Sequence, residues 1–315
     1  MQFIKNFSLD PFYNQAFEEY VFQTYRQGDI LLLWQNRPSV IVGCYQNICR
    51  EVRVPLLRQL GIPVVRRMSG GGTVYHDLGN VNYTYITDLS DGIDYDRCLA
   101  PMLSALRAMG LPAEKGRTCD IVLPGGKVSG SAQRAGGGRL LHHGTLLFDS
   151  DLTLLDQITT HHKNDCFQSK GTQSAICQVT NIRNYLDRDM SLEEFCRGLL
   201  RTLAPEPSRY LTLTAEQETE VCRLQDEKYR SWQWTWGRTP GFTYEKSARL
   251  GESPVYIAYQ ARKGILSGVQ IDSAIPGLAQ AAALLEGARL DPEELRALCC
   301  QAAGEQGQAL WELLL

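Results

Sequence analysis

The sequence predicts an α+β fold in which a large mixed domain precedes a small one. Segments with apolar residues at helical spacing are interspersed with short β-branched runs. The β-branched runs follow one another in pairs, as in hairpins, and do not alternate strictly with helices. The length of 315 residues exceeds the ~50–200 residues of a usual domain, which favours one large and one small unit.

The first predicted elements are a helix and a pair of strands. Apolar residues recur at helical spacing over 14–25, behind Asp10-Pro11, which is typical of a helix start. The runs 30–34 and 39–42 flank Asn36-Arg37-Pro38, and we expect them to pair as strands joined by a turn. The next predicted elements are a helix over 54–60, strands over 64–65 and 82–87, and a helix over 96–109.

Further strands and a helix complete the large domain. Strands are predicted over 121–123, 127–131 and 144–148, around a glycine tip at 136–138 that we expect to be mobile, followed by a helix over 192–203. The alternation of Trp232, Trp234 and Trp236 predicts a strand packed at a domain interface. We place the domain boundary after Pro240-Gly241, which divides the chain into domains over 1–242 and 247–315.

The second domain is predicted to be a small α+β unit. Strands are expected over 255–259 and 268–271, and helices over 277–285 and 292–302.

The composition is that of an ordinary soluble globular protein, with 43% hydrophobic and 21% charged residues. A net charge of −3 supplies no basic excess for nucleic acid, so we expect none as a partner. We find no apolar run of the ~20 residues that a membrane span needs and no signal peptide in residues 1–10. The ten cysteines form no C-x-x-C pair, and we expect a cytoplasmic, membrane-free protein with reduced thiols.

A glycine-rich segment, residues 66–80, is the most informative stretch. Gly70, Gly71 and Gly72 follow Arg66-Arg67, and glycines let backbone N–H groups approach an anion closely. The two arginines are expected to bind a carboxylate or phosphate through paired N–H···O hydrogen bonds. On the glycines alone, an ordinary hairpin turn is the stronger interpretation.

Lys127 is the best single catalytic candidate. It lies among glycines at a strand end, where one ammonium can hold both a carboxylate and the α-phosphate that it attacks. A P-loop does not fit, because Ile121 stands where its first glycine belongs and Val128 where Ser or Thr belongs. The alternative is a hairpin lysine in solvent.

The neighbours of Lys127 suggest further candidates. His142 and His143 point to opposite faces of a strand, so at most one lines the pocket, and we favour His143. Zinc is not supported by the histidine spacing. Asp120 is a candidate to bind Mg²⁺ or orient Lys127, with a turn aspartate as the alternative. Cys166, near lysines and histidines, is a candidate nucleophile, although such a cysteine is more often incidental.

Together these segments resemble the lipoate–protein ligases of the long, two-domain type. The resemblance rests on four blocks in order, supported by Asp10-Pro11 with Asn14, Ala16, Glu18 and Glu19, and by Gly43 with Gln46-Asn47. The blocks are Arg66 to Asn80, Gly116 to Leu147, Lys170 to Asn181, and Trp232 to Phe242. The match spans nearly the whole large domain.

The resemblance implies a fold and a two-step reaction. The fold is the mixed-sheet domain of biotin and lipoate ligases, followed by an accessory domain. Lipoate and Mg²⁺-ATP give lipoyl-AMP, and a lysine of a carrier then accepts the lipoyl group. The carrier is the H protein of glycine cleavage or the lipoyl domain of a 2-oxoacid dehydrogenase acyltransferase subunit. Which of these it is stays open, as does lipoate against octanoate; we expect a monomer.

The resemblance also implies roles for single residues. Lys127 matches a lysine that contacts the lipoyl carbonyl and the α-phosphate, and His143 matches a histidine of the lipoyl tunnel. The family loop that lies along the carboxyl end of the lipoyl group corresponds in this chain to Arg67, Ser69, Gly70, Gly71 and Gly72. The segment beside the nucleotide matches Gly72, Thr73, Val74, Tyr75 and His76, with Asn80 and Asp120 near the phosphates.

The chain departs from the family pattern at two places. The segment after Gly116-Arg117 has Thr118-Cys119-Asp120 where Asn-Asp is usual, which leaves the register of Asp120 open. Cys166 lies roughly where related ATP-independent octanoyl and lipoyl transferases carry a thioester cysteine. A transferase acting through Cys166 is therefore the alternative function, and a degenerate member that only binds lipoate or a carrier is a third.

Overall fold

The computed structural model describes residues 1–89, 92–117, 119–159, 166–206 and 209–315. Its largest part is an eight-stranded mixed sheet in the order β12-β1-β2-β6-β10-β9-β8-β7. The first three strands of this order run parallel, and from β2 to β7 every neighbouring pair is antiparallel. The strands are β1 (Gln2–Ile4), β2 (Ile30–Trp34), β6 (Asn80–Asp88), β7 (Glu114–Lys115), β8 (Asp120–Leu123), β9 (Gly126–Gly136), β10 (Arg139–Leu147) and β12 (Tyr210–Leu211).

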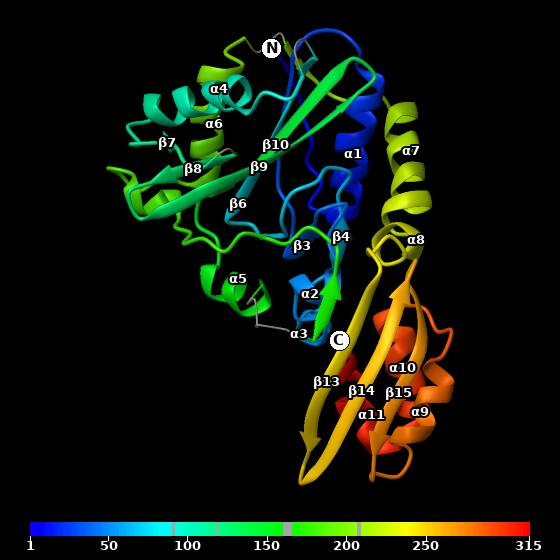
Figure 1. Ribbon diagram of the computed structural model, residues 1–315. Coiled ribbons are helices and arrows are strands. Elements are labelled where there is room, and N and C mark those ends of the chain that lie inside the picture. The colour runs from blue at the N-terminus through cyan, green and yellow to red at the C-terminus, as the bar shows by residue number, and fades with distance from the viewer. Residues whose placement is uncertain (90–91, 118, 160–165, 207–208) are drawn as a thin grey trace.

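Helices cover both faces of this sheet (Figure 1). On one face, α4 (Tyr95–Ala108) and α6 (Leu192–Leu203) form a core with the inward side chains of β2, β6 and β8–β10. On the other, α1 (Pro11–Thr24) packs on β2, β6 and β10. Helix α1 begins where predicted, because the Asp10 carboxylate accepts from the N–H of Phe12 and Pro11 occupies the first turn.

A second, three-stranded sheet lies over the α1 face. Its order is β4-β3-β5, with β3 (Ser39–Val42) between β4 (Val64–Arg66) and β5 (Val74–His76). Its Ile41 and Val65 join the core under α1. The expected pairing of 30–34 with 39–42 is therefore wrong, since β2 pairs with β1 and β6 while β3 pairs with β4 and β5.

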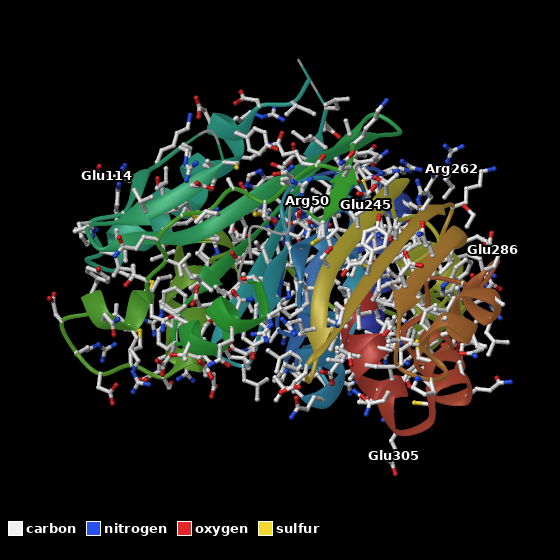
Figure 2. The ribbon with its side chains drawn as sticks, turned by 60° about the horizontal axis from the view of Figure 1, so that its bottom comes forward. Arg50, Glu114, Glu245, Arg262, Glu286 and Glu305 are labelled. Carbon is white, nitrogen blue, oxygen red and sulfur yellow. The ribbon has the colours of Figure 1, made fainter. Side chains whose placement is uncertain are left out.

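The C-terminal part is an antiparallel sheet backed by helices (Figure 1). Strands β13 (Phe242–Leu250), β14 (Ser253–Arg262) and β15 (Ile265–Ser273) pack on α9 (Leu278–Leu285), α10 (Pro292–Ala303) and α11 (Gly307–Leu314). This sheet takes β11 (Phe167–Ser169) as an edge strand, so the first part of the chain contributes to it. The division at 242/247 stays a prediction. Charged side chains such as Glu114 on β7 and Glu305 after α10 project from the surface (Figure 2).

The tryptophan-rich segment is helical and not the predicted strand. Trp232–Thr235 forms α8, which begins where the Ser231 hydroxyl accepts from the N–H of Trp234. Trp232 and Trp236, four residues apart, pack on the C-terminal core, whereas the indole N–H of Trp234 donates to the carbonyl of Arg66. Packing of the tryptophans at a domain interface stays a prediction, as the domain division itself does.

The remaining helices are short. They are α2 (Ile48–Glu51), α3 (Val54–Gln59), α5 (Leu152–Thr159) and α7 (Ala215–Leu224), with 3-10 turns over Ile182–Tyr185 and Gly304–Gln306 and a π-helical turn over Gln225–Tyr229.

Candidate active site

One row of residues crosses the large sheet beneath the site. Trp34 on β2 pairs with Asn82 on β6, and Asn82 pairs with Thr145 on β10. The Thr145 hydroxyl lies 3.4 Å from the N–H of Gly130 on β9, and Gly130 pairs with Asp120 on β8. Four steps between strands of ~4.8 Å put the ends of this row about 19 Å apart. All five residues line one cavity, which therefore follows the row across the sheet.

This cavity, here called cavity 1, has a volume of about 340 Å³. The large sheet is its floor. The opposite wall comes from β3, β5, the glycine loop (residues 70–72) and the segment after β11 (residues 172–175 and 177). The apolar wall residues at the β2 end include Trp34 and Ile41. Its volume and apolar lining are those of a small-molecule site.

A second cavity of about 330 Å³, cavity 2, adjoins the first. Its own walls include Tyr75, Leu147 and, on α5, Leu155 and Asp156. Both cavities share wall residues, namely Thr73, Val74, Lys127, Gly130, Thr145, Ser174, Ala175 and Cys177. The two chambers thus meet along this shared wall.

Lys127 is part of that shared wall. Its Nζ lies 2.7 Å from Oδ1 of Asp120, and its side chain is 25% exposed. Its backbone is held on both sides, since its N–H donates to the carbonyl of Gln178 and its carbonyl accepts from the N–H of Thr180. The structure thus places Lys127 between two cavities, unlike the solvent-facing lysine of the alternative interpretation.

Gly130 leaves the space that the end of Lys127 occupies. A Cβ at position 130 would lie 2.7 Å from Nζ and 2.8 Å from Cε of Lys127. We expect Gly130→Ala to lower the rate of acid activation about 100-fold, because the ammonium must move away from its position. The free energy of unfolding should change by less than about 1 kcal/mol, since only a flexible side-chain end gives way.

Gly136→Ala on the same strand is the matched control for this change. A Cβ there would meet only the Phe22 ring at 3.6 Å, an ordinary contact. Steady-state kinetics and thermal unfolding of both variants test the expectation. Equal rates for the two variants would show that the position of Nζ does not matter.

The side chains of the two arginines donate hydrogen bonds to carbonyls of the protein, and their binding of an anion stays a prediction. Arg66 is fully buried and donates to the carbonyls of Gly43, Gln46 and Thr235. Arg67, at the wall of cavity 1, donates to the carbonyls of Ile41, Gly70 and Gly72 and to the hydroxyl of Ser69. Arg67 therefore shapes the glycine loop, and Gly71 within it adopts a φ of +86° that glycine tolerates.

His143 lines cavity 1, whereas His142 faces the opposite side of β10, as its place in the strand predicts. The Nδ1 of His143 lies 2.9 Å from both carboxylate oxygens of the buried Glu18 on α1. Its Nε2 lies 2.6 Å from Ser69 Oγ. Since Arg67 already donates to Ser69, a chain of hydrogen bonds joins Arg67, Ser69, His143 and Glu18.

Two other histidines are buried without charge. Burial lowers the pKa of both His142 and His76 from 6.5 to about 3. The neighbouring His143 contributes to the lower pKa of His142, and Arg67 followed by His143 contributes to that of His76. The unfolded chain binds the extra protons between pH 3 and 6.5, so stability is fully present above pH 6.5 and falls as the pH falls. Each histidine should cost about 2 kcal/mol of unfolding free energy at pH 5.

The variant His142→Gln tests this pH dependence. It removes one of the two titrations, so its loss of stability between pH 7 and pH 5 should be about 2 kcal/mol smaller than that of the unchanged protein. Urea unfolding at the two pH values measures the difference. Equal losses would contradict the account.

The segment predicted to lie beside the nucleotide divides between the cavities. Tyr75 lines cavity 2, His76 lines cavity 1, and Thr73 and Val74 line both. Asn80 is fully buried in β6, where its amide donates to Asn82. Its burial beneath the site does not support direct contact with phosphates.

Ser174 ties the glycine loop to the segment after β11, a role that the sequence analysis did not assign. Its hydroxyl accepts from the N–H of Thr73 at 2.8 Å and from the amide of Gln46 at 3.0 Å, and it donates to the buried Glu51. The Thr73 hydroxyl also donates to Gln46. One indication of this role was available in the sequence, because Gln46 and Ser174 both lie in segments that carry the family resemblance.

The cysteines are arranged differently from the expectation. Cys166 packs against the C-terminal core, and its carbonyl accepts from the N–H of Glu245. Cys177 lines both cavities and Cys119 lines cavity 1. The departure at 118–120 is only partly visible, because Thr118 lies outside the described residues, but Asp120 lines cavity 1 beside Lys127.

A protein cage for Mg²⁺ is not supported by the part of the chain that the structure describes. Within that part, no three carboxylate, histidine or cysteine side chains cluster as metal ligands. Asp120 offers one oxygen to Lys127, and its other oxygen is 3.9 Å from Arg117. Mg²⁺ at Asp120 stays a prediction, and a single carboxylate fits only an ion that arrives on phosphates.

The chain matches known proteins over most of its length. The model of the lipoyl protein ligase A/B catalytic domain matches residues 10–204. The chain is similar to the lipoate-protein ligase LplJ of Bacillus subtilis (strain 168), with 37% identity over 285 residues, which cover 86% of this chain and 84% of that protein. It is also similar to lipoate-protein ligase 1 of Staphylococcus aureus (strain Mu50), with 35% identity over 279 residues, which cover 86% and 84%.

Solved structures share the fold. The T. acidophilum protein Ta0514 with bound lipoic acid has a TM-score of 0.63 and 25% identity, covering 75% of this chain and 98% of that one. Lipoate-protein ligase A bound with ATP has a TM-score of 0.62 and 25% identity, with 75% and 98% covered. P. falciparum LipL1 in complex with lipoate has a TM-score of 0.62 over 99% of this chain and 97% of its own. Its 20% identity shows the fold alone.

A search of the helices for membrane spans was negative. Among the residues that the structure describes, no helix is both long enough and apolar enough to cross a bilayer.

Proposed function

This chain belongs to the lipoyl protein ligase A/B family, and we propose that it is an ATP-dependent lipoate–protein ligase that acts through lipoyl-AMP. The single observation that carries the proposal is the position of Lys127 in the wall shared by two adjacent cavities. Two neighbouring chambers can hold an acid and a nucleotide close together, and a cation where they meet can offset the charge of their reaction.

We assign the acyl chain to cavity 1 and the nucleotide to cavity 2. Cavity 1 is long, and Trp34 and Ile41 contribute apolar side chains at its far end. A related structure with 25% identity holds lipoic acid, and another with 25% identity holds ATP. In cavity 2, Tyr75 and Leu155 offer apolar walls for a flat base.

The first step is the attack of a lipoate carboxylate oxygen on the α-phosphorus of ATP. The bond from that phosphorus to the leaving pyrophosphate breaks, and lipoyl-AMP forms. Lys127 offsets the negative charge that gathers on the carboxylate and the phosphate in the transition state. Asp120 positions Lys127 through its carboxylate. The same carboxylate would be the protein ligand of a Mg²⁺ ion bound to the phosphates of ATP, which would offset their charge.

The glycine loop is proposed to shield lipoyl-AMP from water. A mixed anhydride hydrolyses readily, so a wall that keeps water from it preserves the intermediate. Arg67 holds the loop by donating to the carbonyls of Gly70 and Gly72, and Ser174 holds its end by accepting from the N–H of Thr73. Gly71 and Gly72 in this loop line cavity 1, along the proposed path of the acyl chain.

In the second step, the amine of a carrier lysine attacks the acyl carbon of lipoyl-AMP. AMP leaves, one proton is released and an amide bond remains on the carrier. We propose a lipoyl carrier protein as the partner, either the glycine cleavage H protein or a 2-oxoacid dehydrogenase lipoyl domain. The ligase is proposed to act as a monomer.

The thioester alternative has no geometric support. Cys166 packs away from Lys127, against the core that β13 and β14 build with the C-terminal helices. A covalent intermediate on this side chain would place the acyl group outside the walls that the described residues give to cavities 1 and 2.

Transfer to a carrier tests the proposal. The full chain, ATP, lipoate and a purified lipoyl domain are incubated together, and the domain is weighed by mass spectrometry. We expect one lipoyl group on the domain only when ATP is present. A domain whose acceptor lysine is replaced by methionine is the control, and lipoylation without ATP would overturn the proposal.

A further inference from the structure

His76 is a buried histidine that faces cavity 1 at the end remote from Lys127. It is 3% exposed, lines the cavity, and meets the Trp34 ring edge-to-face with ring centres 5.9 Å apart. Trp34 is the β2 end of the row that crosses the sheet to Asp120. The side chain of His76 therefore lies where the distal end of an acyl chain would come, if its carboxylate is at Lys127.

A relay of asparagine amides fixes which ring nitrogen of His76 carries the proton. The Nδ2 of Asn14 lies 2.9 Å from the carbonyl of Ser8 and 2.7 Å from that of Gln35. Carbonyls only accept, so this atom is a donor, and it donates also to Oδ1 of Asn36 at 2.8 Å. The remaining amide nitrogen of Asn36 faces Nδ1 of His76 at 2.9 Å, and Nδ1 must therefore accept.

The neutral ring then has its single proton on Nε2. Burial, together with the charge of Arg67, lowers the pKa of His76 to about 3, so the ring is uncharged near pH 7. Among the described residues, this Nε2 has no hydrogen-bond partner. Gln15, also fully buried and in the same cavity wall, has an amide oxygen that the described residues likewise leave unpaired.

A buried donor without a partner costs about 1–3 kcal/mol, which a ligand atom that accepts the proton can recover. At this end of cavity 1 the wall combines the apolar side chains of Trp34 and Ile41 with the amides of Gln15 and Asn82. The amide nitrogen of Asn82 lies 3.4 Å from Nδ1 of His76 and so leaves Nε2 without a partner among the described residues. A saturated alkyl chain leaves the donor unpaired, whereas a ring sulfur is a weak acceptor. Sites that hydrogen-bond a substrate discriminate strongly against analogues without the bonding atom.

We propose that His76 is a specificity-determining residue whose Nε2–H binds an acceptor heteroatom at the distal end of the acyl chain, so that cavity 1 prefers a sulfur-bearing acid to an alkyl acid of similar length. The proposal rests on the proposed function, because it takes cavity 1 as the acyl site. The matching pair of acids is lipoate and octanoate.

The test is a ratio of kcat/KM for lipoate over octanoate, measured by pyrophosphate release from ATP. His76→Phe removes the donor and keeps a flat ring, and we expect the ratio to fall about 10-fold. His76→Gln places an amide N–H near the same position and should restore at least part of the ratio. His142→Gln, a buried histidine on the other face of the sheet, is the matched control and should keep the ratio.

A second measurement avoids variants altogether. In the unchanged protein, the Nε2–H proton of His76 is followed by nuclear magnetic resonance while each acid is added. Lipoate should shift this proton by hydrogen bonding, and octanoate should shift it much less. Equal shifts, or a ratio unchanged in His76→Phe, would overturn the inference while leaving the ligase intact. Absence of pyrophosphate release with both acids would instead overturn the proposed function, and the inference with it.

Discussion

Replacement of Lys127 by alanine is expected to abolish lipoyl-AMP formation while the chain still folds. The ammonium is the one cation that the described residues place in the wall of both cavities, so its loss removes the charge that stabilises the transition state. Removal of one such electrostatic contact lowers a rate about 10²–10³-fold, and here the whole charge is lost, so we expect at least about 10³-fold. Pyrophosphate release with saturating lipoate measures the effect.

Two further variants separate catalysis from stability. Lys127→Ala leaves the Asp120 carboxylate, 9% exposed, with only the more distant Arg117 of its two cationic neighbours among the described residues, which itself destabilises the fold. Lys127→Met combined with Asp120→Asn removes both charges and should recover stability without activity. Lys115→Ala removes an exposed lysine on the edge strand β7, which pairs with Asp96 of α4, and should keep full activity. Lipoyl-AMP synthesis retained in Lys127→Ala would refute the assigned role.

Replacement of Arg67 by lysine is expected to cost both stability and acid binding. The guanidinium makes hydrogen bonds of 2.6 Å and 2.7 Å to the carbonyls of Gly70 and Gly72 and a further one to Ile41. A lysine ammonium has no planar fork and cannot reach all these carbonyls. We expect a loss of about 2–4 kcal/mol of unfolding free energy, because buried carbonyls lose their partners.

The same change should lower kcat/KM for lipoate about 100-fold. Gly71 and Gly72 form part of the wall of cavity 1, and a displacement of about 1 Å in a positioning element costs this much. Arg134→Lys is the control, since Arg134 donates to the carbonyl of Met68, just before the same loop, and not to the carbonyls of its glycines. Denaturant unfolding and steady-state kinetics measure both effects. Normal stability and activity in Arg67→Lys would contradict a structural part for this arginine.

Elements with strong local signals were predictable from the sequence. The helix over 192–203 was predicted with the bounds that the structure gives α6, and Ser191 and Glu194 close its start with a capping box. Lys127 and Asp120 lie on adjacent strands of one hairpin, so their proximity followed from local order along the chain.

Features that depend on long-range packing were not predictable in this way. A turn signal at 36–38 suggested a hairpin, but β2 and β3 belong to two different sheets and each pairs with other strands. The spacing of Trp232, Trp234 and Trp236 fits a strand as well as a helix with residues i and i+4 on one face. Glu18 meets His143 across 125 positions, and only the folded chain brings them together.

The most direct test of the central claim is pyrophosphate release from ATP by the full chain, with and without lipoate and with no carrier present. The account predicts release that depends on lipoate, with lipoyl-AMP recovered from the protein. Absence of release, together with a mass increase of one acyl group on a cysteine after incubation with an acylated carrier, would contradict adenylation at Lys127.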